Sequence, residues 1–313
     1  MRVCRYWWVA VFMVASLASS VAQLSDADQA ITLVARDYEV LPNITYHVAN
    51  RMELKLDIYQ PREPKGPTPV VMLIHGGGWV EGSKEGSVLE VFSYLHMGFS
   101  VVNVEYRLGR VSLAPAAVED CLCALHWIGR NAAKYNFDLD KVIVTGGSAG
   151  GHLALTTGMI PDSAGLANGC ASDDDEGWKG PWNSPTPKVA AIINWFGITD
   201  VWGMLLGPNI RSYAVSWFGS QLGQEALAKR VSPLSYVRPG LPPILTIHGD
   251  ADPLVPYSDA VRLHEALTKA GVRNQLLTIP GGKHGHFPAD ESLKAAETIQ
   301  TFLNTAGIAT AAK

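Results

Sequence analysis

The residues Lys-Val-Ile-Val-Thr-Gly-Gly-Ser-Ala-Gly-Gly occupy positions 141–151, and they carry the strongest structural signal in the chain. Their apolar start predicts a buried strand, and Leu153-Ala154-Leu155 just beyond them favours a helix. A serine between a strand and a helix, flanked at two residues' distance by glycines, is typical of a nucleophile elbow. Gly146 and Gly150 must lack side chains for the strand and the helix to approach each other. A glycine-rich turn that happens to contain Ser148 is the alternative interpretation.

Length and composition indicate an ordinary globular protein. The chain has 313 residues, a net charge of −4 and 17% charged residues. It has no basic excess, so we expect no nucleic-acid partner, and it is long enough for one large α/β domain. No metal-ligand spacing and no cofactor motif appear, so we expect neither a metal nor a cofactor.

The N-terminus is typical of a secretory signal. Arg2 and Arg5 precede an apolar stretch over 7–18 that is too short to span a bilayer, and Ser20-Val21-Ala22 offers small residues for cleavage. We therefore predict a signal peptide over 1–22 and a single mature domain over 23–313. This implies a secreted or periplasmic protein without stable membrane association. An uncleaved N-terminal anchor is the alternative.

Strand-like and helix-like segments alternate along the rest of the chain, which favours a doubly wound α/β fold. Residues 44–49 and 53–59 alternate apolar and polar side chains around Asn50-Arg51, and this pattern predicts an antiparallel hairpin at one sheet edge. Including these two and the strand before Ser148, we expect a mostly parallel sheet of about eight strands. The other strands are expected at 70–75, 100–106, 189–194, 244–248 and 275–279, and helices at 87–97, 115–135, 259–270 and 291–305.

Two segments interrupt this alternation. Residues 161–188 are rich in Gly, Pro, Asp and Ser and are interpreted as a surface loop. Its acidic run at 173–176 is interpreted as a solvated stretch, with a calcium site as the alternative. Residues 198–240 lie between two strands and contain Trp202 and Trp217, which indicates a small cap. We expect it over the carboxyl ends of the strands, where ligands of open α/β sheets bind.

A nucleophilic serine needs a base, and the base needs an acid that holds it. The loop after the strand at 244–248 carries Asp250 and Asp252. Asp252 lies further from the strand and is favoured as the acid. Asp250, and Asp200 in an earlier loop, remain alternatives.

Two histidines compete for the role of base. The loop after the strand at 275–279 carries His284 beside Gly285, and His286 just before an aromatic residue. We favour His284, at the turn, and keep His286 as the alternative. His75 and His248 end predicted strands, so we expect structural roles for them.

The sequence His-Gly-Gly-Gly-Trp at 75–79 follows another predicted strand. Acyl transfer forms an oxyanion that preorganised N–H groups stabilise, and consecutive glycines let the backbone turn its amides toward it. We assign these donors to Gly77, Gly78 and Ala149. Trp79, which adjoins them, is the candidate for substrate contact because its flat ring can stack on an aromatic acyl or sugar group. A phosphate-binding loop is disfavoured, because the lysine and hydroxyl residues that it needs are absent.

Four motifs together resemble the α/β-hydrolase esterases. They lie at 75–79, 146–151, 248–256 and 283–287, and the resemblance extends over roughly 40–306. The most similar branch contains hormone-sensitive lipase and bacterial feruloyl or acetyl-xylan esterases. The resemblance implies an α/β-hydrolase fold in which Ser148 is the nucleophile, Asp252 the acid and His284 the base, with an oxyanion hole at Gly77, Gly78 and Ala149. The histidine loop departs from the usual Gly-His-Gly-Phe, since Lys283 replaces the first glycine and His286 intervenes.

These inferences predict a secreted serine carboxylic-ester hydrolase that forms an acyl-enzyme. Its expected substrates are short-chain acyl esters, or feruloyl and acetyl esters of plant polysaccharides. The alternatives are an amide hydrolase of the formamidase or peptidase type, a non-catalytic binding protein with the same fold, and an interfacial lipase.

The mature chain contains three cysteines. Cys121 and Cys123 are two residues apart on one predicted helix and face different sides, so they do not readily bridge each other. In an oxidising compartment one of them can pair with Cys170, and the sequence leaves this pairing open. For Cys121 we favour a buried thiol.

Overall fold

The computed structural model describes residues 32, 35–170 and 187–308. The predicted signal peptide over 1–22 and the acidic run at 173–176 lie outside these residues. Within the described ranges, no helix combines the length and apolar character needed to cross a bilayer.

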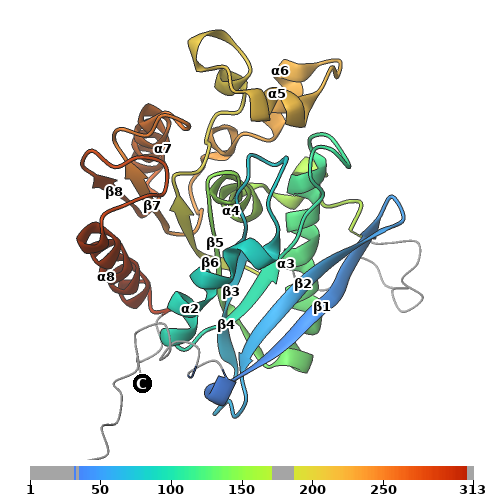
Figure 1. The fold of residues 1–313 in the computed structure, drawn as a ribbon, viewed down its shortest axis with the longest axis vertical. Coiled ribbons are helices and arrows are strands. Elements are labelled where there is room, and N and C mark those ends of the chain that lie inside the picture. The colour runs from blue at the N-terminus through green and yellow to red at the C-terminus, as the bar shows by residue number, and fades with distance from the viewer. Residues whose placement is uncertain (1–31, 33–34, 171–186, 309–313) are drawn as a thin grey trace, which may run out of the picture.

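Eight strands form one sheet in the order β1-β2-β4-β3-β5-β6-β7-β8 (Figure 1). The hairpin of β1 and β2 is antiparallel, β2 pairs antiparallel with β4, and the remaining neighbours are parallel. The predicted mostly parallel sheet with an antiparallel N-terminal hairpin is confirmed. The strands are β1 (Tyr38–Ala49), β2 (Met52–Pro61), β3 (Thr68–Ile74), β4 (Ser100–Val104), β5 (Phe137–Gly147), β6 (Val189–Trp195), β7 (Ile244–Gly249) and β8 (Asn274–Ile279).

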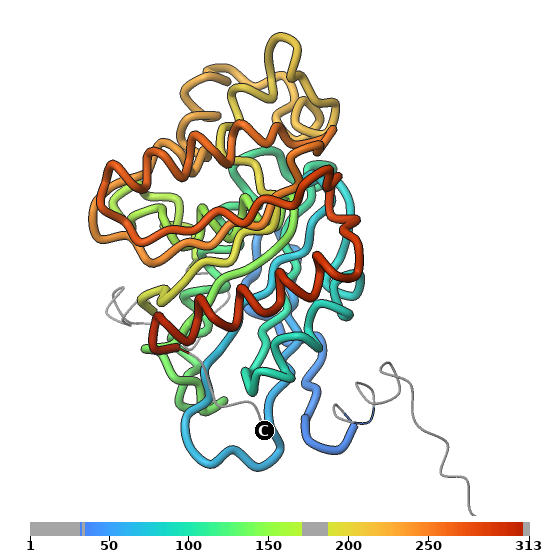
Figure 2. The backbone as a smooth tube through the Cα atoms, turned by 90° about the vertical axis from the view of Figure 1, so that its left-hand side faces the viewer, coloured from blue at the N-terminus to red at the C-terminus, as the bar shows by residue number. Residues whose placement is uncertain are grey.

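Helices cover both faces of the sheet. On one face, α3 (Ala116–Tyr135), α4 (Ala149–Met159) and α7 (Tyr257–Lys269) pack in a core with alternate β3 residues such as Met72. On the other face, α2 (Val88–His96) and α8 (Ala289–Thr305) pack with the intervening residues such as Leu73. Figure 2 shows α8 crossing in front of the strands. Interior parallel strands are apolar on both sides because helices cover both faces.

Residues 198–240 pack over the sheet end at which β5 reaches Ser148 (Figure 1). Trp217, Phe218 and Val231 from this cap are fully buried in the same core as α3 and α4. The cap is therefore part of the main core. The elements of the cap are η3 (Trp202–Met204), η4 (Gly207–Asn209), α5 (Ser212–Phe218), α6 (Gln224–Arg230) and η5 (Pro233–Tyr236). Two further short 3₁₀ helices lie outside the cap, η1 (Lys84–Ser87) and η2 (Asp162–Ala164).

A disulfide joins Cys123 on α3 to Cys170, which follows η2, with 4.9 Å between their Cα atoms. Cys121 is a buried free thiol. The pairing that the sequence left open therefore uses Cys123. The disulfide covalently links the segment after α4 to the middle of α3.

Candidate active site

Ser148 lies at a sharp turn between β5 and α4. Its backbone has φ +57° and ψ −121°, a conformation that strains a residue with a side chain. The Ser148 N–H donates to the Trp195 carbonyl at 2.9 Å. A Cβ added at Gly146 or Gly150 would lie 2.3 or 2.1 Å from the Ile74 carbonyl oxygen. Both glycines are therefore required, because the turn is pressed against the end of β3.

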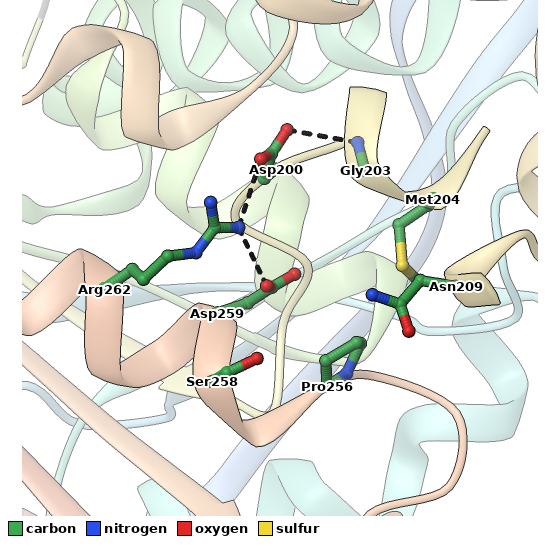
Figure 3. A pocket seen from close by; sticks show the side chains of 8 residues that line it. All are labelled: Asp200, Gly203, Met204, Asn209, Pro256, Ser258, Asp259 and Arg262. Atoms are coloured by element: carbon green, nitrogen blue, oxygen red, sulfur yellow. Dashed lines mark hydrogen bonds and ion pairs between the residues drawn. The ribbon is translucent and has the colours of Figure 1, made fainter. Parts of the chain in front are cut away.

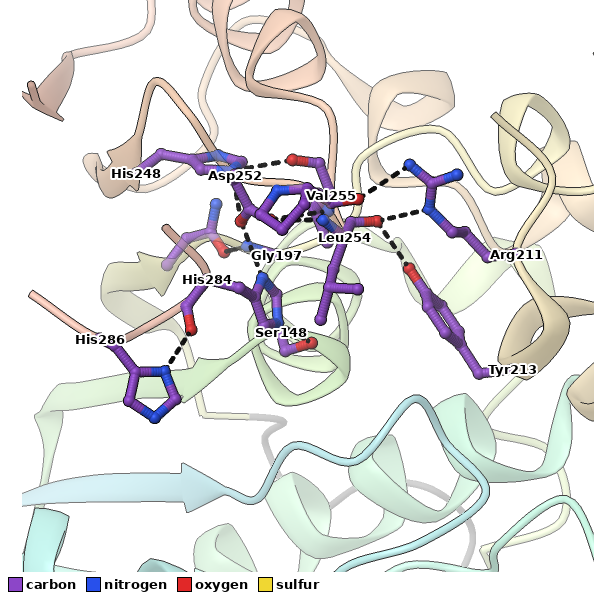
Figure 4. Close-up of polar contacts among 12 residues, drawn as sticks. Ser148, Gly197, Arg211, Tyr213, His248, Asp252, Leu254, Val255, His284 and His286 are labelled. Carbon is purple, nitrogen blue, oxygen red and sulfur yellow. Dashed lines mark hydrogen bonds and ion pairs between the residues drawn. The ribbon is translucent and has the colours of Figure 1, made fainter. Parts of the chain in front are cut away.

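The structure brings Ser148, His284 and Asp252 into one hydrogen-bonded line (Figure 4). His284 Nε2 lies 2.9 Å from Ser148 Oγ, and His284 Nδ1 lies 2.7 Å from Asp252 Oδ2. These residues come from the loops after β5, β8 and β7. A neutral imidazole that donates its Nδ1 hydrogen to a carboxylate presents a lone pair on Nε2 to the hydroxyl, as a general base requires.

The Asp252 side chain is fully buried and accepts four hydrogen bonds. His284 and His248 donate to Oδ2, and the N–H groups of Leu254 and Val255 donate to Oδ1 at 2.7 and 3.0 Å. Burial alone would raise the pKa of Asp252, but these donors outweigh it and hold the pKa below its usual range. The carboxylate is therefore ionised and fixed in orientation.

The two rival aspartates do not contact His284. Asp250 Oδ1 accepts the Gly281 N–H at 2.7 Å and so joins the loops after β7 and β8. Asp200 pairs with Arg262 at 3.1 Å. Asp200, Arg262 and Asp259 line a polar cavity of about 240 Å³ between the cap and α7, and its lining does not include the triad. Figure 3 shows these side chains and the ion pairs between them.

The alternative base, His286, points away from Ser148 in Figure 4. Its Nδ1 lies 3.1 Å from the carbonyl oxygen of His284, and the side chain is exposed. Gly285, with φ +74°, turns the backbone between the two histidines, so only His284 faces the serine.

The loop over 75–79, called the oxyanion loop below, lies against Ser148. A Cβ added at Gly76 would lie 3.6 Å from Ser148 Cβ. Gly77, Gly78 and Trp79 have consecutive positive φ values of 113°, 57° and 62°. Across the described part of the chain, the N–H groups of Gly77, Gly78 and Ala149 find no hydrogen-bond acceptor. One of these donors lies on the elbow and two lie on the loop that packs against it, and within the described residues all three remain available to a ligand.

The prediction that Trp79 contacts the substrate is wrong. Its side chain is 0% exposed, its ring stacks on Trp217 with 4.2 Å between centroids, and its indole N–H donates to His152. The positive φ turns the side chain into the core beneath the cap. Tyr213 instead adjoins the oxyanion loop, because a Cβ added at Gly78 would lie 2.8 Å from Tyr213 Cβ.

Sequence reasoning missed Tyr213 and Phe196 at the site and expected only a structural role for His248. Tyr213 donates its hydroxyl to the Leu254 carbonyl at 3.1 Å, next to the acid. His248 supports Asp252. Phe196, with φ +41°, places its ring edge-on to His284 at 4.7 Å between centroids. Phe196 and His248 lie at the carboxyl ends of predicted strands, which is a sequence signal because the ends of parallel strands gather at the site. Tyr213 carried no such signal.

Within the described residues, no group of three or more His, Cys, Asp or Glu side chains is arranged to hold a metal ion. The chemistry available at this site is that of a serine hydroxyl, an imidazole, a carboxylate and unused backbone N–H groups.

Comparison with known families gives two matches. Residues 56–267 match the BD-FAE family, and residues 225–311 match the TAP-like protein family Abhydrolase_4. Among curated proteins, esterase LipQ of Mycobacterium tuberculosis is 27% identical over 272 residues, and esterase LipC of the same organism is 29% identical over 261 residues. These alignments cover 83% and 80% of this chain but only 61% of each relative.

Solved structures align over nearly their whole length. The propionate-bound esterase Est2 of Thermogutta terrifontis has a TM-score of 0.70 and 27% identity, covering 88% of this chain and 96% of that one. A truncated carbohydrate esterase from gut microbiota has a TM-score of 0.69 and 30% identity, covering 87% and 97%.

Proposed function

The chain belongs to the BD-FAE family of α/β-hydrolases, and from this membership we propose that it is a carboxylic-ester hydrolase with Ser148 as its nucleophile. The observation that carries the proposal is the line from Ser148 through His284 to Asp252. Three N–H groups on the elbow and the oxyanion loop have no acceptor among the described residues. This arrangement supplies a nucleophile, a base, an oriented acid and an oxyanion site, which together are what acyl transfer needs.

In the first half of the proposed cycle, His284 Nε2 takes the proton from Ser148 Oγ while Oγ attacks the ester carbonyl carbon. The carbonyl oxygen becomes an oxyanion and accepts hydrogen bonds from Gly77, Gly78 and Ala149. Asp252 stabilises the imidazolium. The imidazolium then protonates the leaving alcohol oxygen as the carbon–oxygen bond breaks, which leaves an acyl group on Oγ.

In the second half, water takes the place of the alcohol. His284 removes a proton from this water as its oxygen attacks the acyl carbon. The resulting tetrahedral intermediate collapses, the proton returns to Ser148 Oγ, and the carboxylic acid leaves.

The proposed substrates carry a short acyl group, such as acetyl, or a small aromatic acyl group, such as feruloyl, on a plant polysaccharide. Tyr213 supports a limit on acyl length, because its ring lies against Gly78 and its hydroxyl is bonded to the Leu254 carbonyl. The Tyr213 side chain therefore occupies space beside the oxyanion loop. The similar structures described with propionate bound and as a carbohydrate esterase agree with this choice.

We also propose that the protein acts outside the cytoplasm. The disulfide between Cys123 and Cys170 supports this location, because disulfides persist mainly in oxidising compartments. Removal of residues 1–22 would leave the enzyme without stable membrane association.

The test combines a Ser148→Ala variant with an ester panel. The variant should lose turnover by up to about 10⁶-fold while its thermal midpoint stays close to that of the wild type. The wild type, and not the variant, should be labelled by a fluorophosphonate. If Ser148→Ala retains most of the ester cleavage, Ser148 is not the nucleophile.

The panel compares acetyl, butyryl, octanoyl and feruloyl esters of one alcohol with the matched anilides. Faster cleavage of acetyl or feruloyl esters supports the proposed substrate class. A maximum at octanoyl would favour a lipase, and faster anilide cleavage an amide hydrolase. Absence of both labelling and cleavage would indicate a binding protein.

A further inference from the structure

A buried hydrogen-bond chain joins the oxyanion loop, the elbow helix α4 and the cap. The Trp79 indole N–H donates to His152 Nδ1 at 3.1 Å, and His152 Nε2 lies 2.7 Å from the Val231 carbonyl oxygen. All three residues have 0% exposure. One imidazole thus links three segments that are far apart in the sequence.

These partners fix the protonation of His152. An indole nitrogen only donates and a carbonyl oxygen only accepts, so Nδ1 must carry a lone pair and Nε2 must carry the hydrogen. Burial lowers the pKa of His152 to about 4, which keeps the ring neutral near neutral pH. A protonated ring would lose the acceptor for Trp79.

The acceptor matters because the Trp79 backbone is strained. Its φ of +62° continues the positive values of Gly77 and Gly78, and for a residue with a side chain this conformation costs about 1–2 kcal/mol. The bond to His152 and the stack on Trp217 offset that cost. Backbone hydrogen bonds also hold this turn, since the Trp79 carbonyl accepts the Gly109 N–H and the Gly77 carbonyl accepts the N–H groups of Val80 and Glu81, so the two side-chain contacts add to these backbone anchors.

His152 also touches the nucleophile's own backbone. It lies in the first turn of α4, and its N–H donates to the Ser148 carbonyl at 3.0 Å. The same residue therefore ties the elbow, which supplies the Ala149 donor, to the loop that supplies the Gly77 and Gly78 donors. The tie to the elbow is made by the His152 backbone, and the tie to the oxyanion loop is made by its side chain through the Trp79 indole.

We propose that His152 is a positioning residue for the oxyanion hole, acting through the indole of Trp79. This inference rests on the proposed function. His152 does not contact the reacting atoms, so its removal should lower kcat with little change in KM, because the loss falls on the transition state.

Three substitutions separate the two hydrogen bonds of His152. In His152→Asn, Oδ1 occupies the bonding position of Nδ1 and can accept the indole N–H, whereas the donor to Val231 is lost. In His152→Gln, Nε2 occupies the bonding position of the histidine Nε2 and can donate to Val231, whereas the acceptor for Trp79 is lost. His152→Leu loses both. The Asn and Gln variants form a matched pair.

With an acetyl ester, we expect kcat of the Gln and Leu variants to fall by about 10- to 100-fold, less than the loss of a whole oxyanion donor. The Asn variant should stay within about fivefold of the wild type, and KM should change by less than about threefold in all three. The affinity for a trifluoromethyl ketone, which forms an oxyanion on Ser148, should fall in parallel with kcat.

The inference is overturned if the Gln variant keeps the wild-type kcat while the Asn variant loses it. In that case kcat would depend on the hydrogen bond from His152 to the Val231 carbonyl and not on the bond from Trp79. It is also overturned if, across the three variants, the loss of kcat parallels the loss of thermal stability and does not depend on whether the new side chain can accept the Trp79 N–H. Wild-type ester cleavage and fluorophosphonate labelling of Ser148 test the proposed function separately. An active, labelled wild type with unaffected His152 variants would reject only this inference.

Discussion

His248 and His284 reach the same oxygen of Asp252. Their nitrogen atoms Nε2 and Nδ1 lie 3.1 and 2.7 Å from Asp252 Oδ2 (Figure 4). His248 Nε2 also lies 3.2 Å from the Val255 carbonyl oxygen, and two acceptors on one nitrogen require that it carries the hydrogen. The proposed acid, Asp252, thus accepts a hydrogen bond from a second imidazole, that of the fully buried His248.

Replacing His248 should weaken catalysis without removing it. His248→Leu deletes one donor from the Asp252 carboxylate, which raises the Asp252 pKa and loosens its hold on His284. We expect kcat to fall by about 10-fold, the equivalent of 1.4 kcal/mol from a charged hydrogen bond. His248→Gln keeps a donor at the same bonding position and should lose about threefold or less. Equal losses in the two variants would assign the effect to packing.

A methyl group at Gly285 should disturb the proposed base. A Cβ there would lie 2.9 Å from the Phe196 ring, which packs against His284. Gly285→Ala should therefore lower kcat by about 10-fold or more in addition to the backbone cost of about 1–2 kcal/mol.

The matched control for this substitution is Gly281→Ala. Gly281 has a similar φ of +65°, and a Cβ there meets nothing within 4 Å. The control should lose similar stability in urea unfolding but keep kcat within about threefold of the wild type. Similar losses of kcat in both variants would contradict a role for the Phe196 contact.

Acid should destabilise the fold through its buried neutral histidines. Burial lowers the pKa of His75 and His152 from 6.5 to about 4, so between these pH values the unfolded chain binds protons that the folded protein does not. This stabilisation is complete above pH 6.5 and is lost as the pH falls toward 4. Each of the two contributes up to about 3 kcal/mol.

Urea unfolding at several pH values between 4 and 7 measures this slope. His152→Asn removes one of the titrating groups, so the stability of the variant should fall less steeply with acid than that of the wild type. An identical slope in both proteins would show that the His152 proton does not contribute.

Loss of the disulfide should lower stability far more than activity. The cysteines are 47 residues apart, and closing a loop of this length is worth about 4 kcal/mol in the unfolded chain. Cys170→Ser should lower the free energy of unfolding by about this amount and leave kcat at 20 °C within about twofold. Adding a reductant to the wild type should have the same effect, and no further effect on the variant.

The sequence was informative wherever local pattern determines structure. Alternating segments indicated where strands and helices follow one another along the chain, and the hairpin turn at Asn50-Arg51 lies between β1 and β2 as expected. β1 begins earlier than expected, at Tyr38, because a bulge between Leu41 and Ile44 interrupts its alternation. The glycines around Ser148 indicated the elbow because steric contacts there allow nothing larger.

Long-range contacts explain the remaining errors and omissions. Trp79 was expected to face a substrate, but Trp217 and His152, which lie far along the chain, hold its ring in the core. The sequence favoured His284 over His286 from the turn beside Gly285, and the structure places His284 against Ser148. The contact of His284 with the Phe196 ring is a long-range feature that no local pattern encodes. His248 was expected to be structural, and its contact with Asp252 depends on how the loop after β7 folds back.

The order of strands has a consequence for the timing of activity. Among the described residues, β8 is the last strand in sequence and also the outermost on its side of the sheet, where its neighbour is β7. A nascent polypeptide that has folded only as far as β7 would contain Ser148 and Asp252 but no imidazole between them. In the proposed mechanism, the Ser148 hydroxyl therefore has no base until β8 joins the sheet, and reactivity appears only after this strand has docked.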